Sequence, residues 1–284
     1  MKIHPSAIVS PEAQIDETAE IGPFCIIESG VEIAAGCRLL AQVKVHSGTT
    51  IGRETTVFEG AVLGGMPQHT RVSENLGKLV IGERNMLREQ VTIHSSMNSD
   101  QATVIGDDCM LMVGSHIAHD CRLGNRVILT NGVMVGGHVE IGDRAYLGGN
   151  AAVHQFCRIG SLAMVGGCSK LVQDVPPYLL TDGASAMIVG LNTIGLRRAG
   201  FSRDQIKQLK AAYRTIYRQG LPFDEMVATL EDQFTSHPAT DLASFFRGGT
   251  RGFVQERRSP PRAAIRIHPE VDDEVDAPSR RLAS

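Results

Sequence analysis

The sequence predicts a mainly β protein: a parallel β-helix shaped as a triangular prism, followed by a C-terminal α-helical domain. The main observation is a spacing of six residues. Stepping by six from Ile3 to Leu171 reaches 29 positions, and 26 of them are Ile, Leu or Val. Neither a helical periodicity nor the alternation of a strand produces this spacing. Hexapeptide repeats do, and they are typical of β-helices. Three hexads would make one coil, and stacked coils would pair at about 4.8 Å.

The positions around each of these aliphatic residues, here called rungs, support the same fold. Two residues before a rung the side chain is usually small, and one residue after it glycine recurs. We interpret the cysteines in the small position as reduced core residues rather than disulfide partners. We expect the glycines to supply positive φ at the corners of the prism. The cysteines are Cys25, Cys37, Cys109, Cys121 and Cys157, with Cys168 one residue out of frame, and the glycines are Gly22, Gly52, Gly82, Gly106, Gly124, Gly142 and Gly160.

Composition excludes several classes of protein. The net charge is −3, Trp is absent and aromatic residues make up 5% of the chain, which argues against a nucleic-acid binder. No apolar run reaches the length of a membrane span. The repeat begins at Ile3, so we expect no signal peptide. These features predict a soluble, cytoplasmic protein.

The patterns divide the chain into three segments. The β-helix is expected over residues 1–190, with polar excursions at 64–78 and 95–102 that are either neutral insertions or functional flaps. A helical domain is expected over residues 191–253. In it, Ser202 and Gln205 form a capping box before an amphipathic run to Gln219, and further helices are expected at 223–234 and 241–247. Residues 254–284 are expected to be a disordered tail.

Four histidines fall where a coil of three hexads places them along one edge of the prism. His116, His119, His138 and His154 lie on three successive coils, and none occupies a rung, so we expect them to point outward. Such a column suits general-base catalysis by a neutral imidazole, or a metal held by three imidazoles. Asp120 could orient His119 if the chain bends there. The glycines around Gly137 leave backbone N–H groups that could stabilise an oxyanion.

Several motifs closely resemble the bacterial UDP-N-acetylglucosamine O-acyltransferases of lipid A biosynthesis. The most specific are His-Ile-Ala-His-Asp-Cys at 116–121, Val-His-Gln-Phe at 153–156 and Gln-Asp-Val-Pro-Pro-Tyr at 173–178. The likeness covers roughly residues 1 to 253. It implies a left-handed β-helix, a homotrimer and active sites in clefts between subunits. It also implies transfer of an (R)-3-hydroxyacyl chain from acyl carrier protein to the glucosamine 3-hydroxyl of UDP-N-acetylglucosamine, without a metal or cofactor.

The resemblance also implies roles for individual residues. His119 would be the general base, Asp120 would orient it, and the Gly137 N–H would bind the oxyanion. Gly167 would limit acyl-chain length. The residues implied in binding the sugar and nucleotide are His116, His138, His154, Gln155, Asn192 and Arg198, together with Gln68 and Arg71 in the first excursion.

The chain departs from the family pattern at a few positions. In the first excursion, His69 stands where an acidic residue is common, and Arg71 replaces a lysine. Ile194 replaces a typical glutamate, Ala199 a frequent second arginine and Ser185 a histidine. The histidine column is intact, so these changes concern the nucleotide contacts.

Other functions remain open at the level of sequence. The sister N-acyltransferase acts on an amine of acylated UDP-glucosamine, but it usually carries an extra N-terminal domain, and we expect none here because the repeat begins at Ile3. A zinc-dependent hydratase on the same prism needs three converging histidines. A non-enzymatic scaffold needs long threonine ladders, and only two Thr-Thr pairs are present near residue 50. A basic stripe on the first long helix, from Arg203 to Arg218, fits an acidic carrier protein.

Overall fold

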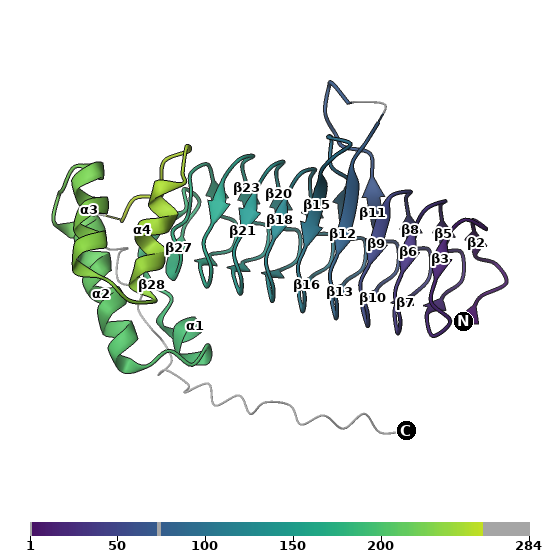
Figure 1. Cartoon of the computed structure of the whole chain (residues 1–284), viewed down its shortest axis with the longest axis horizontal. Coiled ribbons are helices and arrows are strands. Elements are labelled where there is room, and N and C mark those ends of the chain that lie inside the picture. Colours follow the sequence, from purple (N-terminus) through teal and green to yellow (C-terminus); the bar gives the residue numbers. More distant parts are fainter. Residues whose placement is uncertain (1, 73–74, 258–284) are drawn as a thin grey trace.

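The computed structural model describes residues 2–72 and 75–257. In this part of the chain, short parallel strands wind into a long prism with three flat faces, and helices gather at the end remote from the N-terminus (Figure 1). The mainly β prediction with a helical C-terminal part is therefore confirmed.

Each face of the prism is one sheet, and successive strands of the chain visit the three faces in turn. The first sheet contains β1 (Lys2–Ile3), β4 (Glu20–Ile21), β7 (Arg38–Leu39), β10 (Thr56–Val57), β13 (Met86–Leu87), β16 (Met110–Leu111), β19 (Ile128–Leu129), β22 (Tyr146–Leu147), β25 (Met164–Val165), β27 (Leu179–Asp182) and β28 (Met187–Leu191). The second contains β2 (Ile8–Val9), β5 (Ile26–Ile27), β8 (Lys44–Val45), β11 (Val62–Gly65), β14 (Thr92–His94), β17 (His116–Ile117), β20 (Met134–Val135), β23 (Ala152–Val153) and β26 (Lys170–Leu171). The third contains β3 (Gln14–Ile15), β6 (Glu32–Ile33), β9 (Thr49–Ile51), β12 (Lys78–Ile81), β15 (Ala102–Ile105), β18 (Arg122–Leu123), β21 (Glu140–Ile141) and β24 (Arg158–Ile159).

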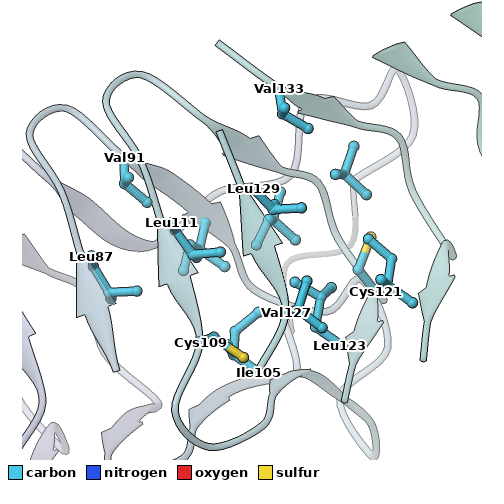
Figure 2. Close-up of a cluster of buried hydrophobic side chains, with 14 of the residues drawn as sticks. Leu87, Val91, Ile105, Cys109, Leu111, Cys121, Leu123, Val127, Leu129 and Val133 are labelled. Carbon is cyan, nitrogen blue, oxygen red and sulfur yellow. The ribbon is translucent and has the colours of Figure 1, made fainter. Parts of the chain in front are cut away.

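The rungs fill the interior of the prism. Leu111 and Leu129 pair in register on neighbouring coils, and both are fully buried, as is Ile117 on the next face. Figure 2 shows Leu111 and Leu129, together with Cys109 and Cys121, pointing into one continuous core. A buried aliphatic side chain contributes roughly 1.5–3 kcal/mol, so this column of rungs holds the coils together. The five in-frame cysteines are buried and free, as expected, and Cys168 is exposed.

The glycines that follow the rungs do not have the conformation we expected. None of the seven has positive φ. They are required because the next coil lies so close: a Cβ added at Gly22 would come within 2.6 Å of the Leu40 carbonyl oxygen. Positive φ occurs instead at other corner positions, which hold either a different glycine, such as Gly30 (φ 65°), or a residue with a side chain, such as Asp120 (φ 61°) and His138 (φ 58°). The recurrent glycine marks close packing between coils, and the left-handed backbone lies elsewhere in the corner.

Two excursions leave the prism where the rung pattern is interrupted. The first joins β11 to β12 and rises from the edge of the solenoid (Figure 1), and the second joins β14 to β15. After each, the chain returns to the same three faces, because β12 pairs with β9 and β15 pairs with β12. Both excursions therefore lie beside the coils that carry the histidine column.

The C-terminal part begins with an antiparallel hairpin and continues as helices. β27 and β28 pair antiparallel, and α1 (Thr193–Arg198), α2 (Arg203–Arg218), α3 (Phe223–Gln233) and α4 (Ala239–Arg247) follow. The capping box is present, because Ser202 Oγ accepts from the Gln205 N–H and the Gln205 side chain accepts from the Ser202 N–H. Helix α1 was not predicted. Within the described ranges, no helix combines the length and apolarity needed to cross a bilayer.

The chain after α4 runs back along the end of the prism. The Val254 N–H donates to the Asp174 carbonyl oxygen, and Glu256 accepts from the hydroxyl of Tyr213 at 2.6 Å. Residues 254–257, expected to start the tail, thus pack on the hairpin and on α2. The remaining residues of the expected tail, 258–284, lie outside the described residues.

Candidate active site

The histidine column lies at the corner between the second and third sheets. Asp120, His138 and Phe156 occupy the same corner position on three successive coils, with φ of 61°, 58° and 66°. The His138 N–H donates to the His119 carbonyl oxygen at 3.0 Å, and the Phe156 N–H donates to that of Gly137 at 3.0 Å. The left-handed corner therefore supplies the bend that lets neighbouring residues His119 and Asp120 face each other.

His119 and Asp120 form a buried pair. His119 Nδ1 lies 2.7 Å from Asp120 Oδ2, and the two side chains are 9% and 3% exposed. Burial raises the pKa of Asp120, but hydrogen bonds from Ser96, His119 and the Met97 N–H outweigh burial and hold it below its ordinary value. A charged Asp120 fixes the Nδ1–H tautomer of His119, which leaves the lone pair on Nε2 free to accept a proton.

Gly137 lies against the imidazole of His119. A Cβ added there would come within 2.8 Å of His119 Cε1 and 2.9 Å of Nε2, so the ring would have to move for any other residue. The Gly137 N–H makes no hydrogen bond within the described part of the chain. A free N–H on a residue packed against the imidazole suits the stabilisation of an oxyanion next to a general base.

His138 contacts His119 from the next coil. The two rings meet edge to face with centroids 5.1 Å apart, and His138 Nε2 lies 3.7 Å from Asp120 Oδ2. On its other side His138 stacks on Phe156, at 4.6 Å and nearly parallel. Burial lowers the pKa of His138 more than the Asp120 charge raises it, so this imidazole is neutral at pH 7.

His116 lies on the same coil as His119, one coil nearer the N-terminus than His138, and it contacts His94. Its Nδ1 lies 2.7 Å from Thr92 Oγ1, and its ring meets that of His94 edge to face at 4.7 Å. Burial lowers the pKa of His116. Burial, followed by the neighbouring imidazoles, lowers the pKa of His94 to about 4. The buried His94 Nδ1 has no hydrogen-bond partner among the described residues.

His154 and Gln155 are exposed at the other end of the column. Arg251, from the segment after α4, donates to His154 Nδ1 at 3.0 Å and to the Val172 carbonyl oxygen at 3.3 Å. The C-terminal part of the chain therefore reaches the column through Arg251.

The first excursion covers His119. The ring of His69 meets His119 edge to face with centroids 5.9 Å apart, and the Arg71 N–H donates to His69 Nδ1. Gln68 and Arg71 are exposed on the same loop. We expected the four histidines to point outward from the prism. At His119 the excursions close over this outer side and leave the residue 7% exposed.

Asn192, Arg198 and Gly167 lie elsewhere on the prism. Asn192 caps α1: its Oδ1 accepts from the Gly195 N–H at 3.0 Å and its Nδ2 donates to the Leu162 carbonyl oxygen at 2.9 Å. Gly167 is at the corner between the first and second sheets. Asn192 and Arg198 line a groove of about 670 Å³ over the first sheet. Its lining includes the apolar Ile128, Tyr146 and Met164 and the arginines Arg126 and Arg144. One chain therefore does not bring Asn192 and Arg198 together with His119.

His119, Asp120 and His138 are also the described residues whose arrangement could hold a metal ion. Their ligand atoms lie within 4.8 Å of one another. A metal would have to displace the hydrogen bond between His119 and Asp120, and the group has two histidines where a zinc hydratase of this fold needs three.

Sequence reasoning missed several residues of this site. Phe156 could have been found, because it follows His138 by the length of one coil. His94 and Thr92 also lie on the second sheet, but the rung count is interrupted between them and the column. Ser96 and Met97 belong to the second excursion, where the six-residue repeat is interrupted and cannot predict where a side chain lies in space.

Comparison with known proteins gives matches to two family profiles and to many relatives. The family profile described as "Udp N-acetylglucosamine O-acyltransferase; Domain 2" matches residues 174–254, and that of "Bacterial transferase hexapeptide (six repeats)" matches residues 102–137. The acyl-[acyl-carrier-protein]–UDP-N-acetylglucosamine O-acyltransferase of Burkholderia orbicola is 48% identical over 260 residues, 89% of this chain and 99% of the relative. That of Halorhodospira halophila is 49% identical over 257 residues, with the same coverage.

Solved structures give the same result. UDP-N-acetylglucosamine O-acyltransferase from Moraxella catarrhalis superposes with a TM-score of 0.87 at 39% identity, over 90% of this chain and 100% of that chain. LpxA from Acinetobacter baumannii gives 0.86 at 38% identity, over 89% and 99%. Because superposition preserves handedness, these scores confirm the left-handed winding that the resemblance implied. The chain belongs to the family of acyl-[acyl-carrier-protein]–UDP-N-acetylglucosamine O-acyltransferases.

Proposed function

We propose that this protein transfers an (R)-3-hydroxyacyl chain from acyl carrier protein to the glucosamine 3-hydroxyl of UDP-N-acetylglucosamine, the first step of lipid A biosynthesis. The observation that carries the proposal is the buried His119–Asp120 pair packed against Gly137, whose N–H has no partner among the described residues. Relatives that share nearly half of their residues with this chain carry the name of this activity.

The reaction follows from the positions of these groups. His119 Nε2 accepts the proton of the 3-hydroxyl while the hydroxyl oxygen attacks the carbonyl carbon of the thioester. The carbonyl electron pair moves onto oxygen, where the Gly137 N–H stabilises the negative charge. The C–S bond then breaks, and the departing carrier-protein thiolate takes the proton held by His119. Asp120 remains ionised throughout and stabilises the imidazolium between the two transfers.

The remaining histidines suit the sugar side of the reaction. His116, His138 and His154, with Gln155, follow the corner away from His119 and would hydrogen-bond the sugar and the nucleotide. Gln68 and Arg71 would reach the same ligand from the first excursion. Burial lowers the pKa of both His116 and His138, which favours the neutral imidazoles that suit hydroxyl partners.

The position of Asn192 and Arg198 supports a site shared between subunits. Both residues lie over the first sheet, away from the corner that carries His119. They can serve the same substrate only if a neighbouring copy presents its first-sheet groove to this corner. A closed ring of such contacts is a cyclic oligomer, and a homotrimer is the one we propose. Gly167 would then line the path of the acyl chain.

The donor side suits an acidic partner. Arg203, Lys207, Lys210 and Arg214 are exposed on α2, and opposite charge accelerates association. We therefore propose acyl carrier protein as the partner that docks near this helix, in the cytoplasm, where such carriers work.

One experiment tests the function directly. The purified protein is incubated with UDP-N-acetylglucosamine and a series of 3-hydroxyacyl carrier proteins of different chain length, and the products are identified by mass spectrometry. We expect one ester-linked acyl group per sugar and a clear preference for one chain length. Absence of any acylated nucleotide sugar, or transfer only to an amino sugar, would contradict the proposal.

A further inference from the structure

The carboxylate of Asp120 is held from behind by the second excursion. Ser96 is fully buried, and its hydroxyl donates to Asp120 Oδ1. The Met97 N–H donates to Asp120 Oδ2 at 3.3 Å. Ser96 Oγ in turn accepts from the Asn98 N–H at 3.0 Å, and the Ser96 carbonyl accepts from the Gly77 N–H of the first excursion at 2.9 Å. The hydroxyl is therefore fixed on both sides.

Asp120 has two imidazoles within reach, so its orientation matters. Oδ2 lies 2.7 Å from His119 Nδ1 and 3.7 Å from His138 Nε2. A carboxylate free to rotate could turn toward His138 and release the Nδ1–H of His119. A hydrogen bond to Oδ1 prevents this rotation, and bonds to an ionised acceptor are about twice as strong as neutral ones. The Asn98 carbonyl, 3.2 Å away, is the weaker acceptor for the same hydroxyl proton.

We propose that Ser96 is a positioning residue for the catalytic pair: its hydroxyl locks the Asp120 carboxylate so that Oδ2 holds His119 in the tautomer with a basic Nε2. This inference rests on the proposed acyl transfer. It assigns a function to the second excursion, which brings no group of its own to the reacting atoms.

The same hydrogen bond affects the pH dependence of the pair. The titratable groups that face Asp120 are His119 and His138, with His69 against His119 and His94 behind His116. The Ser96 donor on Oδ1 stabilises the ionised carboxylate and lowers the pKa of Asp120, which holds His119 through its other oxygen. Loss of this donor moves the acid limb of the activity profile to higher pH.

The test compares two serines that are neighbours in the same loop. Ser96→Ala removes the donor to Asp120. Ser95→Ala is the matched control, because Ser95 is equally buried but donates to the Gly64 carbonyl oxygen instead, at 3.1 Å. For Ser96→Ala we expect kcat to fall by about tenfold with KM within about twofold, and the acid limb to move up by roughly half a pH unit. For Ser95→Ala we expect neither change. Equal effects from the two variants, or a loss of kcat with an unmoved acid limb, would overturn the proposal.

A double-mutant cycle separates positioning from a general effect of the loop. In an Asp120→Asn background the Ser96→Ala change should cost less than about twofold, because the carboxylate on which Ser96 acts is already gone. The same tenfold loss in both backgrounds would show that Ser96 acts independently of Asp120.

A second readout keeps this inference separate from the proposed function. With ¹⁵N-labelled histidine, the Nδ1 proton of His119 can be followed by NMR without substrate. In Ser96→Ala we expect that proton to exchange faster with solvent, and an unchanged rate would contradict positioning. If the wild-type protein transferred no acyl group, the proposed reaction would fail while this measurement still tested Ser96.

Discussion

A trimer assembled from two kinds of subunit tests whether the active site is shared between neighbours. One subunit carries His119→Ala and the other Arg198→Ala, each with its own affinity tag, and only trimers that bear both tags are purified. Because His119 lies at one corner and Arg198 over the opposite sheet, the shared site that we propose needs His119 from one subunit and Arg198 from the next. Each parent trimer contains no complete site.

The expected activity follows from symmetry. A ring of three subunits that contains both kinds has one interface at which an intact His119 faces an intact Arg198. This holds whether the ring has two subunits of the first kind or two of the second. Doubly tagged trimers should therefore recover about one third of the wild-type rate per trimer. The rate is measured at low UDP-N-acetylglucosamine concentration, where weaker substrate binding caused by loss of the arginine lowers the rate most. Parent trimers should remain near background. Mixed trimers that are as inactive as their parents would refute the shared site. His119 and Arg198 would then either act within the same subunit or bind different ligands.

Further predictions concern the site and its stability. His119→Ala should fold and assemble normally but lose ~10²–10⁴ in kcat/KM, the usual contribution of a general base, and near-wild-type turnover would remove the mechanism. Gly137→Ala should lose at least about a hundredfold in kcat, because its Cβ would displace the imidazole; an unaffected rate would show that the ring tolerates the shift. Dialysis against a chelator should leave the rate within about twofold, and activity restored only by added zinc would contradict metal-free chemistry. His94 has a pKa near 4 when folded, below its unfolded value of about 6.5, so the unfolded chain binds the extra proton between these pH values. The free energy of unfolding should therefore fall by up to about 3 kcal/mol as pH drops from 6.5 to 4, and by less in His94→Gln, as urea unfolding at pH 7 and 4.5 would show.

The parts of the fold that repeat were predictable from the sequence. Rungs such as Leu111 and Leu129 lie in the core because a prism wound from hexads buries every sixth side chain, and the same count placed His119 and His138 on one edge. Helix α2 was predictable because Ser202 and Gln205 form a local signal. Helix α1 was missed: it has six residues, and Asn192, interpreted only as a ligand, is its N-cap.

The parts that do not repeat were beyond sequence reasoning. Ser96 reaches Asp120 through an irregular loop whose path depends on contacts with the first excursion, as at Gly77. The burial of His119 depends on the same loops. The glycines after each rung were predicted for a positive φ, and this reason was wrong. Their pattern alone does not distinguish a required φ from a neighbouring coil that leaves no space for a Cβ, as at Gly22.

The regular pairing between coils has a consequence for engineering. Near the N-terminus each strand pairs with the strand one full turn away in an identical register, as in Ile8 with Ile26 and Ile26 with Lys44. Removing one complete turn there would join two surfaces that already match, and would shorten the rod by about 4.8 Å without altering any bond in the catalytic corner. The length of the rod and the chemistry of the histidine column can thus be changed separately.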